Sequence, residues 1–222
     1  MSFATLFDFN GVLVDDEAVH LDAFREALLP LNIEVSDQDY FERYIGFDDV
    51  GAFRAILEDA GRAADDDFVR QLVEAKRPLY RRRAEQSLVL FPGAASLVRR
   101  RAGHGTVAVV SGALRDEIEL GLERLAVRDC VAFIISAEDT KYSKPDPEGY
   151  LLAMQRLSAE PAVVIEDSVA GVQAAHAAGL GVVAVAHSAP SSALLAAGAR
   201  VVRERLADIE DVDFRLATDA RP

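Results

Sequence analysis

The feature that most constrains the fold is a series of short runs, rich in Val and Ile, that alternate with helix-like segments. The runs, which are candidate strands, are residues 4–7, 107–110, 131–135, 163–165, 182–185 and 200–202. Continuous apolar runs of this length suit strands buried on both faces, as in a parallel sheet. Helically spaced apolar residues lie between most of them, over 114–126, 148–158 and 169–178. From residue 88 onward, the pattern therefore predicts an α/β fold with a doubly wound sheet.

Residues 15–87 show a different pattern. Their helical periods cover residues 21–28, stopped near Pro30, then 40–44, 50–60 and 68–83. No strong strand signal interrupts these periods, so we expect a helical insertion between the first strand and the rest of the sheet. The predicted domains are a core of residues 1–14 and 88–222 and a helical domain of residues 15–87.

Composition disfavours several classes of protein. The formal net charge of −13 argues against a nucleic-acid groove, because polyanion binding needs clustered cations. No apolar run reaches the roughly 18 residues of a membrane helix, and no basic region precedes an apolar signal segment. The one cysteine excludes an internal disulfide framework and fits a reducing compartment. We therefore expect a cytoplasmic protein that binds neither nucleic acid nor membrane, and further expect a monomer or weak dimer.

Polar residues follow the ends of four separate predicted strands. They are Asp8, the pair Ser111-Gly112, Lys144 in a Ser-Lys-Pro-Asp-Pro loop, and the pair Glu166-Asp167. Open parallel sheets bind ligands outside these strand ends. An Asp there can act as a nucleophile or hold a metal, and helix N-termini bind phosphate. Each element alone is explained more simply as a cap or loop residue. Their occurrence together, each at a strand end, favours a phosphate site.

The stretch Asp8-Phe9-Asn10-Gly11 resembles the first motif of the haloacid dehalogenase superfamily of phosphohydrolases, which is usually Asp-x-Asp-Gly. Ser111, Lys144 and Glu166-Asp167 are similar to the other three motifs, in the same order. The resemblance covers nearly the whole chain, and the subfamily it points to contains beta-phosphoglucomutase and phosphoglycolate phosphatase. It implies a Rossmann-like core with a parallel sheet, and it implies that residues 15–87 form a mobile helical C1 cap.

The same resemblance implies an activity: Mg²⁺-dependent hydrolysis of a small phosphorylated metabolite, such as a sugar phosphate. Asp8 would attack phosphorus and form an aspartyl-phosphate. Mg²⁺ would be held by the Asp8 carboxylate, the Asn10 backbone carbonyl and Asp167, with Glu166 as a direct ligand or one step removed. Carboxylates with water and phosphate oxygen are a ligand set that Mg²⁺ accepts.

Further residues are implied to bind the substrate. The phosphate oxygens would be held by Ser111, the Gly112 amide and Lys144. His20 and Lys76 lie where caps of this subfamily place substrate-binding residues, although a solvated helix face is the alternative for each. Residues 45–49 resemble the specificity loop of the cap. They place acidic residues where the phosphoglucomutase has an Arg for a second phosphate, which disfavours a phosphomutase.

Asn10 departs from the family pattern. The usual Asp at this place is the general acid and then the general base, and an amide can be neither. A positioned acid–base group contributes about 10²–10⁴-fold in rate. Three explanations remain open. The chain is an engineered variant that traps a complex, or it is a phospho-ligand-binding homologue without turnover. Alternatively, it is an enzyme whose leaving group needs little protonation or takes a proton from the cap, with His20 as the nearest candidate. Asn matches neither the Tyr of haloacid dehalogenases nor the Ala of phosphonoacetaldehyde hydrolases.

Overall fold

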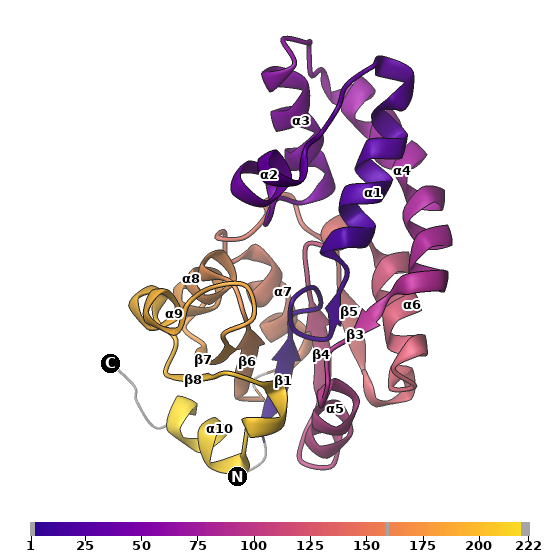
Figure 1. The fold of residues 1–222 in the computed structure, drawn as a ribbon. Coiled ribbons are helices and arrows are strands. Elements are labelled where there is room, and N and C mark those ends of the chain that lie inside the picture. Colours follow the sequence, from indigo (N-terminus) through magenta and orange to yellow (C-terminus); the bar gives the residue numbers. More distant parts are fainter. Residues whose placement is uncertain (1–2, 159, 219–222) are drawn as a thin grey trace. The chain divides into compact units, whose positions relative to one another are not determined.

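The computed structural model describes residues 3–158 and 160–218. The chain forms two compact units, Met1–Val14 with Leu90–Pro222 and, between them in sequence, Asp15–Val89 (Figure 1). We call these the core unit and the helical unit. The two segments that connect the units form a small two-stranded sheet of β2 (Val14–Asp15) and β3 (Val89–Leu90). Among the described residues, no helix has the length and apolar character to cross a membrane.

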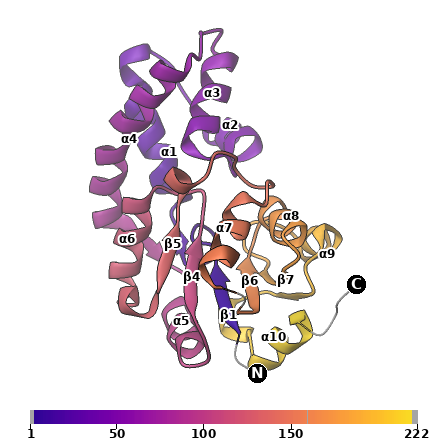
Figure 2. The same cartoon turned by 180° about the vertical axis from the view of Figure 1, so that it is seen from behind.

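A six-stranded sheet forms the centre of the core unit, with the order β5-β4-β1-β6-β7-β8 and parallel pairing throughout (Figures 1 and 2). Its strands are β1 (Ala4–Phe7), β4 (Val107–Val110), β5 (Phe133–Ile135), β6 (Ala162–Glu166), β7 (Gly181–Val185) and β8 (Val201–Arg203). The chain runs outward from β1 to β5 and then returns to β6 on the other side of β1. The strand order thus reverses beside β1, where sheets of this kind bind ligands.

Helices cover both faces of this sheet, as the apolar runs predicted. One buried layer, which includes Leu6 and Val164, packs against α7 (Glu148–Arg156), α8 (Val169–Ala177) and α9 (Ser191–Ala197). Leu6 and Val164 are fully buried, as expected for continuous apolar strands.

The other face is covered in part by α5 (Ala94–Ala102) and α10 (Asp211–Thr218). The guanidinium carbon of Arg101 in α5 contacts two rings, at 4.8 Å from the Phe3 centroid and 4.1 Å from the Phe214 centroid. This buried guanidinium joins α5 and α10 to Phe3, the residue before β1, because a cation over an aromatic face is attracted by the ring quadrupole.

The helical unit consists of α1 (Glu17–Leu28), the short α2 (Asp37–Asp39), α3 (Asp49–Asp59) and α4 (Asp66–Ser87). A π-helical turn at Tyr40–Tyr44 follows α2 directly. Asp48 and Asp65 begin α3 and α4, since their carboxylates accept hydrogen bonds from Gly51 N (2.7 Å) and Phe68 N (2.9 Å). Phe24 of α1 and Phe53 of α3 pack edge to face at 4.8 Å.

The predicted strands and helices occur with shifted ends. The strand expected at 131–135 begins at Phe133, because Arg128–Cys130 forms a 3₁₀ turn that still includes the Val131 amide. The helix expected at 114–126 is α6 (Arg115–Arg124). The pattern missed β2 and β3, since two-residue strands carry no periodicity.

Candidate active site

Three carboxylates from two neighbouring strands meet at the carboxyl edge of the sheet. Asp8 follows β1, Glu166 ends β6, and Asp167 follows it. One oxygen from each of these three buried residues lies within 4.8 Å of the others. Parallel pairing of β1 with β6 causes this convergence, because it places both strand ends at one edge.

Lys144 is the counter-charge of this cluster. Its Nζ lies 2.9 Å from Asp8 Oδ1 and 2.7 Å from Glu166 Oε1, and it lies 5.4 Å from the centroid of the Tyr150 ring. Burial alone would lower the pKa of Lys144, but the charges of Asp8 and Glu166 outweigh burial and hold the pKa well above its usual value. Lys144 is therefore a permanent cation inside the cluster.

Both oxygens of Glu166 already accept hydrogen bonds. Oε1 accepts from Lys144 Nζ and from the Tyr150 hydroxyl at 3.2 Å. Oε2 accepts from Asp167 N, Ser168 N and Ser168 Oγ at 2.9–3.0 Å. Burial acts to raise the pKa of Glu166, but Lys144 and the backbone donors overcome it, and the pKa is lowered. Glu166 therefore stays ionised and holds Lys144 in place.

Asp8 and Asp167, in contrast, lie where negative charge is costly. Burial raises the pKa of Asp8 to about 6, although Lys144 opposes the shift. Burial, followed by the charges of Glu166 and Asp8, raises the pKa of Asp167 well above its usual value. A hard divalent cation with oxygen ligands would compensate both charges. The carboxylates present thus fit a metal such as Mg²⁺.

The Asn10 side chain is tied to the end of β4. Asn10 Oδ1 accepts a hydrogen bond from Ser111 Oγ at 3.3 Å, and Ser111 Oγ accepts one from Ala113 N at 3.2 Å. Gly112 is exposed and lies in the bend between Ser111 and Ala113. Ser111 and Gly112 are thus brought beside the first motif, as the sequence suggested.

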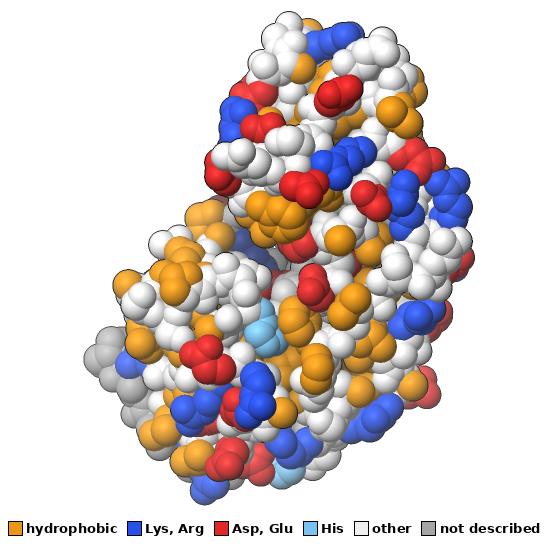
Figure 3. All heavy atoms as spheres, in the orientation of Figure 1, with side chains coloured by type: hydrophobic (Ala, Val, Ile, Leu, Met, Phe, Trp, Pro, Cys, Tyr) orange, Lys and Arg blue, Asp and Glu red, His pale blue; other side chains and the backbone are white. Residues whose placement is uncertain are grey.

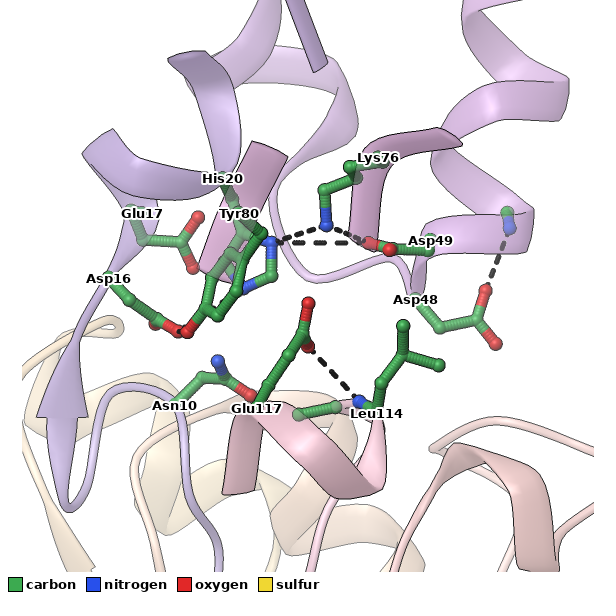
Figure 4. Close-up of polar contacts among 12 residues, drawn as sticks. Asn10, Asp16, Glu17, His20, Asp48, Asp49, Lys76, Tyr80, Leu114 and Glu117 are labelled. Atoms are coloured by element: carbon green, nitrogen blue, oxygen red, sulfur yellow. Dashed lines mark hydrogen bonds and ion pairs between the residues drawn. The ribbon is translucent and has the colours of Figure 1, made fainter. Parts of the chain in front are cut away.

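Ser111 and Gly112 do not begin the next helix, which was expected from residue 113. The N-cap of α6 is Leu114, and its amide donates to Glu117 Oε2 at 3.1 Å (Figure 4). Glu117 is a buried carboxylate that the sequence analysis did not single out. It satisfies one of the amides at the start of the helix.

His20 and Lys76 meet within the helical unit. Figure 4 shows Lys76 Nζ between His20 Nδ1, at 2.8 Å, and Asp49 Oδ1, at 2.5 Å. His20 Nε2 lies 3.2 Å from Asp16 Oδ2, which also accepts from the Tyr80 hydroxyl at 2.6 Å. Because an ammonium group only donates, His20 Nδ1 must accept and Nε2 carries the proton toward Asp16. The Lys76 charge is matched by Asp49.

The two acidic residues of the 45–49 segment differ in their contacts. Asp48 caps α3, whereas Asp49 pairs with Lys76. Apolar side chains are also exposed around this segment, and Figure 3 shows such side chains at the surface of the helical unit; the exposed residues are Phe41, Ile45, Phe47 and Val50. An arginine for a second phosphate is absent from residues 45–49.

Sequence reasoning missed several residues of the core unit. Tyr150 was assigned only to an apolar stripe, although its hydroxyl contacts Glu166. Ser188 Oγ donates to Asp167 Oδ2, and His187 Nδ1 lies 2.8 Å from the Gly11 carbonyl oxygen. His187 and Ser188 follow β7, so the rule that selected polar residues after strands would have found them. Tyr150 carried no such signal.

The chain was compared with known proteins. A sequence model of the family described as haloacid dehalogenase-like hydrolase matches residues 5–185. The bifunctional riboflavin kinase/FMN phosphatase of Arabidopsis thaliana is 31% identical over 214 residues, which are 94% of this chain and 55% of that protein. This chain therefore spans about half the length of that relative. The fructose-1-phosphate phosphatase YqaB of Escherichia coli is 30% identical over 188 residues, 81% of this chain and 94% of that protein.

Solved structures share the fold. The crystal structure of CbbY from Rhodobacter sphaeroides in complex with phosphate aligns with a TM-score of 0.84 and 24% identity, covering 97% of this chain and 100% of that chain. The family match begins in β1, ends with β7, and includes the four strand-end motifs. The chain belongs to the haloacid dehalogenase-like hydrolases.

Proposed function

We propose that the protein is a phosphatase that hydrolyses phosphate monoesters of small metabolites, such as sugar phosphates, with Asp8 as the nucleophile. The observation that carries this proposal is the position of Lys144, whose ammonium group bridges the buried carboxylates of Asp8 and Glu166. A cation beside a nucleophilic carboxylate reduces its repulsion from a phosphate dianion. The named activities of the FMN and fructose-1-phosphate phosphatases support the substrate class.

In the proposed reaction, an Asp8 carboxylate oxygen attacks phosphorus, the bond from phosphorus to the ester oxygen breaks, and this oxygen leaves as an alcohol with a proton taken from solvent water. Water then attacks the aspartyl-phosphate and gives up a proton to the solvent, which releases inorganic phosphate and restores Asp8. Lys144, the Ser111 hydroxyl and the Gly112 amide bind the phosphoryl oxygens. Glu166 orients Lys144, because it already accepts a hydrogen bond from that side chain.

We propose that Asp8, Asp167 and the Asn10 carbonyl hold Mg²⁺, with Glu166 adjoining them. When bound, Mg²⁺ supplies charge compensation between the nucleophile and the phosphate. The helical unit is proposed to act as the cap, with His20 and Lys76 as substrate-binding residues. Asn10 cannot protonate a leaving oxygen, so we expect slow turnover of alkyl phosphates.

The test is phosphate release from sugar phosphates, phosphoglycolate, FMN and nitrophenyl phosphate, with Mg²⁺ or with EDTA. We expect activity that needs the metal and is lost in Asp8→Asn. Asp129→Asn, which changes an exposed carboxyl group, is the matched control and should retain the activity. Full activity of Asp8→Asn would contradict the proposal.

A second candidate is a protein that binds a phosphorylated ligand without turnover, and Asn10 is the observation that favours it. Calorimetry with the same panel would then show saturable binding. Neither this chain nor Asn10→Asp would release phosphate. Release by Asn10→Asp alone would show that the site is an enzyme site limited by proton transfer.

A further inference from the structure

We propose that Ser188 is a positioning residue for the metal site, and that the loop of His187 and Ser188 after β7 holds both Asp167 and the Asn10–Gly11 turn in their binding geometry. The inference rests on the proposed function only in assuming that a divalent cation binds at Asp167. It assigns a role to a strand end that none of the four motifs includes.

The first observation is the contact of Ser188 with Asp167. Strands β6 and β7 are neighbours, with Glu166 in register with Ala184, so the chain leaving β7 lies next to the chain leaving β6 (Figure 1). Ser188 Oγ donates to Asp167 Oδ2. Asp167 is only 2% exposed, whereas Ser188 is exposed. The hydroxyl therefore covers one carboxylate oxygen from the solvent side and leaves the other oxygen for a cation.

The second observation is the close approach of Gly11. Gly11 has a φ of +72°, and a Cβ atom there would lie 1.9 Å from Asp167 Oδ2 and 2.9 Å from Ser188 Oγ. The space that a side chain would fill is therefore taken by this carboxylate and this hydroxyl. Only glycine is compatible with both the backbone conformation and the contact.

The third observation is the contact of His187 with the same turn. His187 Nδ1 lies 2.8 Å from the Gly11 carbonyl oxygen, so Nδ1 carries the proton and donates it. The imidazole stacks on the Phe91 ring with a centroid distance of 4.1 Å and an angle of 13°. The stack fixes the ring plane. The hydrogen bond thus holds the Gly11–Val12 peptide, which directly follows the peptide that carries the Asn10 carbonyl, the expected metal ligand.

These contacts act on ligands rather than on the metal itself. Partners that orient metal ligands typically contribute 10–100-fold to metal affinity. Loss of the Ser188 hydroxyl would free the Asp167 carboxylate to rotate, so part of the free energy of cation binding would be used to order this carboxylate. We therefore expect Ser188→Ala to weaken binding of a divalent cation by about 10–100-fold.

The experiment is an Mn²⁺ titration of the full chain, followed by electron paramagnetic resonance of the free ion. Ser188→Thr keeps a hydroxyl group and should restore most of the affinity that Ser188→Ala loses. Ser191→Ala is the matched control, because the Ser191 hydroxyl donates to the exposed Glu204 at 3.2 Å and should not affect binding. Urea unfolding of each variant verifies that it is folded.

His187→Phe tests the other half of the loop, since it keeps an aromatic ring over Phe91 but removes the donor to Gly11. We expect weaker Mn²⁺ binding than in the unchanged chain. Unaltered Mn²⁺ affinity in Ser188→Ala, or equal weakening in Ser188→Thr, would overturn the role of Ser188. Unaltered affinity in His187→Phe would overturn that of His187.

The failure of this inference is distinguishable from failure of the proposed function. If the unchanged chain binds Mn²⁺ and Ser188→Ala binds it more weakly, the inference stands even when no substrate releases phosphate. If the unchanged chain releases phosphate but Ser188→Ala binds Mn²⁺ equally well, the proposed function stands and this inference is wrong. Absence of Mn²⁺ binding to the unchanged chain would also overturn it.

Discussion

The Lys144 ammonium lies 2.9 Å from the Asp8 carboxylate, which places a cation directly against the group that we propose as the nucleophile. The same ammonium lies 2.7 Å from Glu166, and Glu166 is fully buried. Two carboxylates thus share one cation. Asp167 receives less compensation, and its pKa is raised by burial and then by its acidic neighbours. The ionised carboxylates of Asp8 and Asp167 therefore lower the stability of the folded protein.

The first prediction concerns Asp8→Asn and stability. Burial raises the Asp8 pKa from 3.8 to about 6, so the folded state holds a proton more tightly than the unfolded state. Stability associated with Asp8 is therefore present below pH 4 and lost as pH rises through 6. At pH 7 without metal, the free energy of unfolding of Asp8→Asn should be about 1–3 kcal/mol higher than that of the unchanged chain.

Urea unfolding in EDTA at pH 7 and pH 4 measures this difference. The gain should shrink at pH 4, where Asp8 is protonated in the folded state. Asp129→Asn, at an exposed position, should change little at either pH. An Asp8→Asn protein less stable than the unchanged chain at pH 7 would contradict the raised pKa.

The second prediction concerns the pH dependence of metal binding. A cation binds the ionised forms of Asp8 and Asp167, and both pKa values are raised, that of Asp8 to about 6. Protons therefore compete with the metal, and affinity should fall as pH is lowered through 6. Calorimetry with Mg²⁺ in buffers of different ionisation enthalpy should also detect proton release. Constant affinity between pH 5 and 7.5 would argue against these ligands.

The third prediction concerns Asn10→Asp. Asn10→Asp keeps the backbone carbonyl and an oxygen that can accept the hydrogen bond from Ser111, and it adds the carboxyl group that the proton relay lacks. Turnover of a sugar phosphate should rise by about 10²–10⁴-fold. The gain on nitrophenyl phosphate should be smaller, because this leaving group departs without a proton. Steady-state phosphate release measures both, and equal rates on an alkyl phosphate would show that another group already supplies the proton.

The fourth prediction concerns the Lys144–Glu166 pair. Lys144→Met leaves Glu166 buried without its counter-charge, which should destabilise the protein by about 3–5 kcal/mol. Glu166→Gln removes the charge and keeps the shape of the side chain, with an amide nitrogen in place of one carboxylate oxygen. The destabilisation of the double variant should therefore be smaller than the sum of the destabilisations that the two single substitutions cause. Urea unfolding of all four proteins gives the coupling free energy, and additive effects would show that the two residues act independently.

Much of the core unit was predictable from the sequence. The strands are continuously apolar because both faces are buried. Apolar runs such as 107–110 and 182–185 therefore locate the strands even when the neighbouring strands in the sheet are unknown. The positions of Asp8 and Asp167 at strand ends follow from local chain order in the same way. The general rule for parallel sheets then places such residues at one edge.

The sequence by itself thus determined the strand and helix segments, the helical insertion and the strand ends that carry polar groups, because these depend on neighbours along the chain. Tertiary structure decided which groups pair. Glu166 is saturated by Lys144, Tyr150 and backbone amides rather than left open. Ser188 reaches Asp167 only because β7 lies beside β6. Such pairings depend on distances across the sheet, and burial then sets the pKa of each carboxyl group, a property that no local pattern encodes.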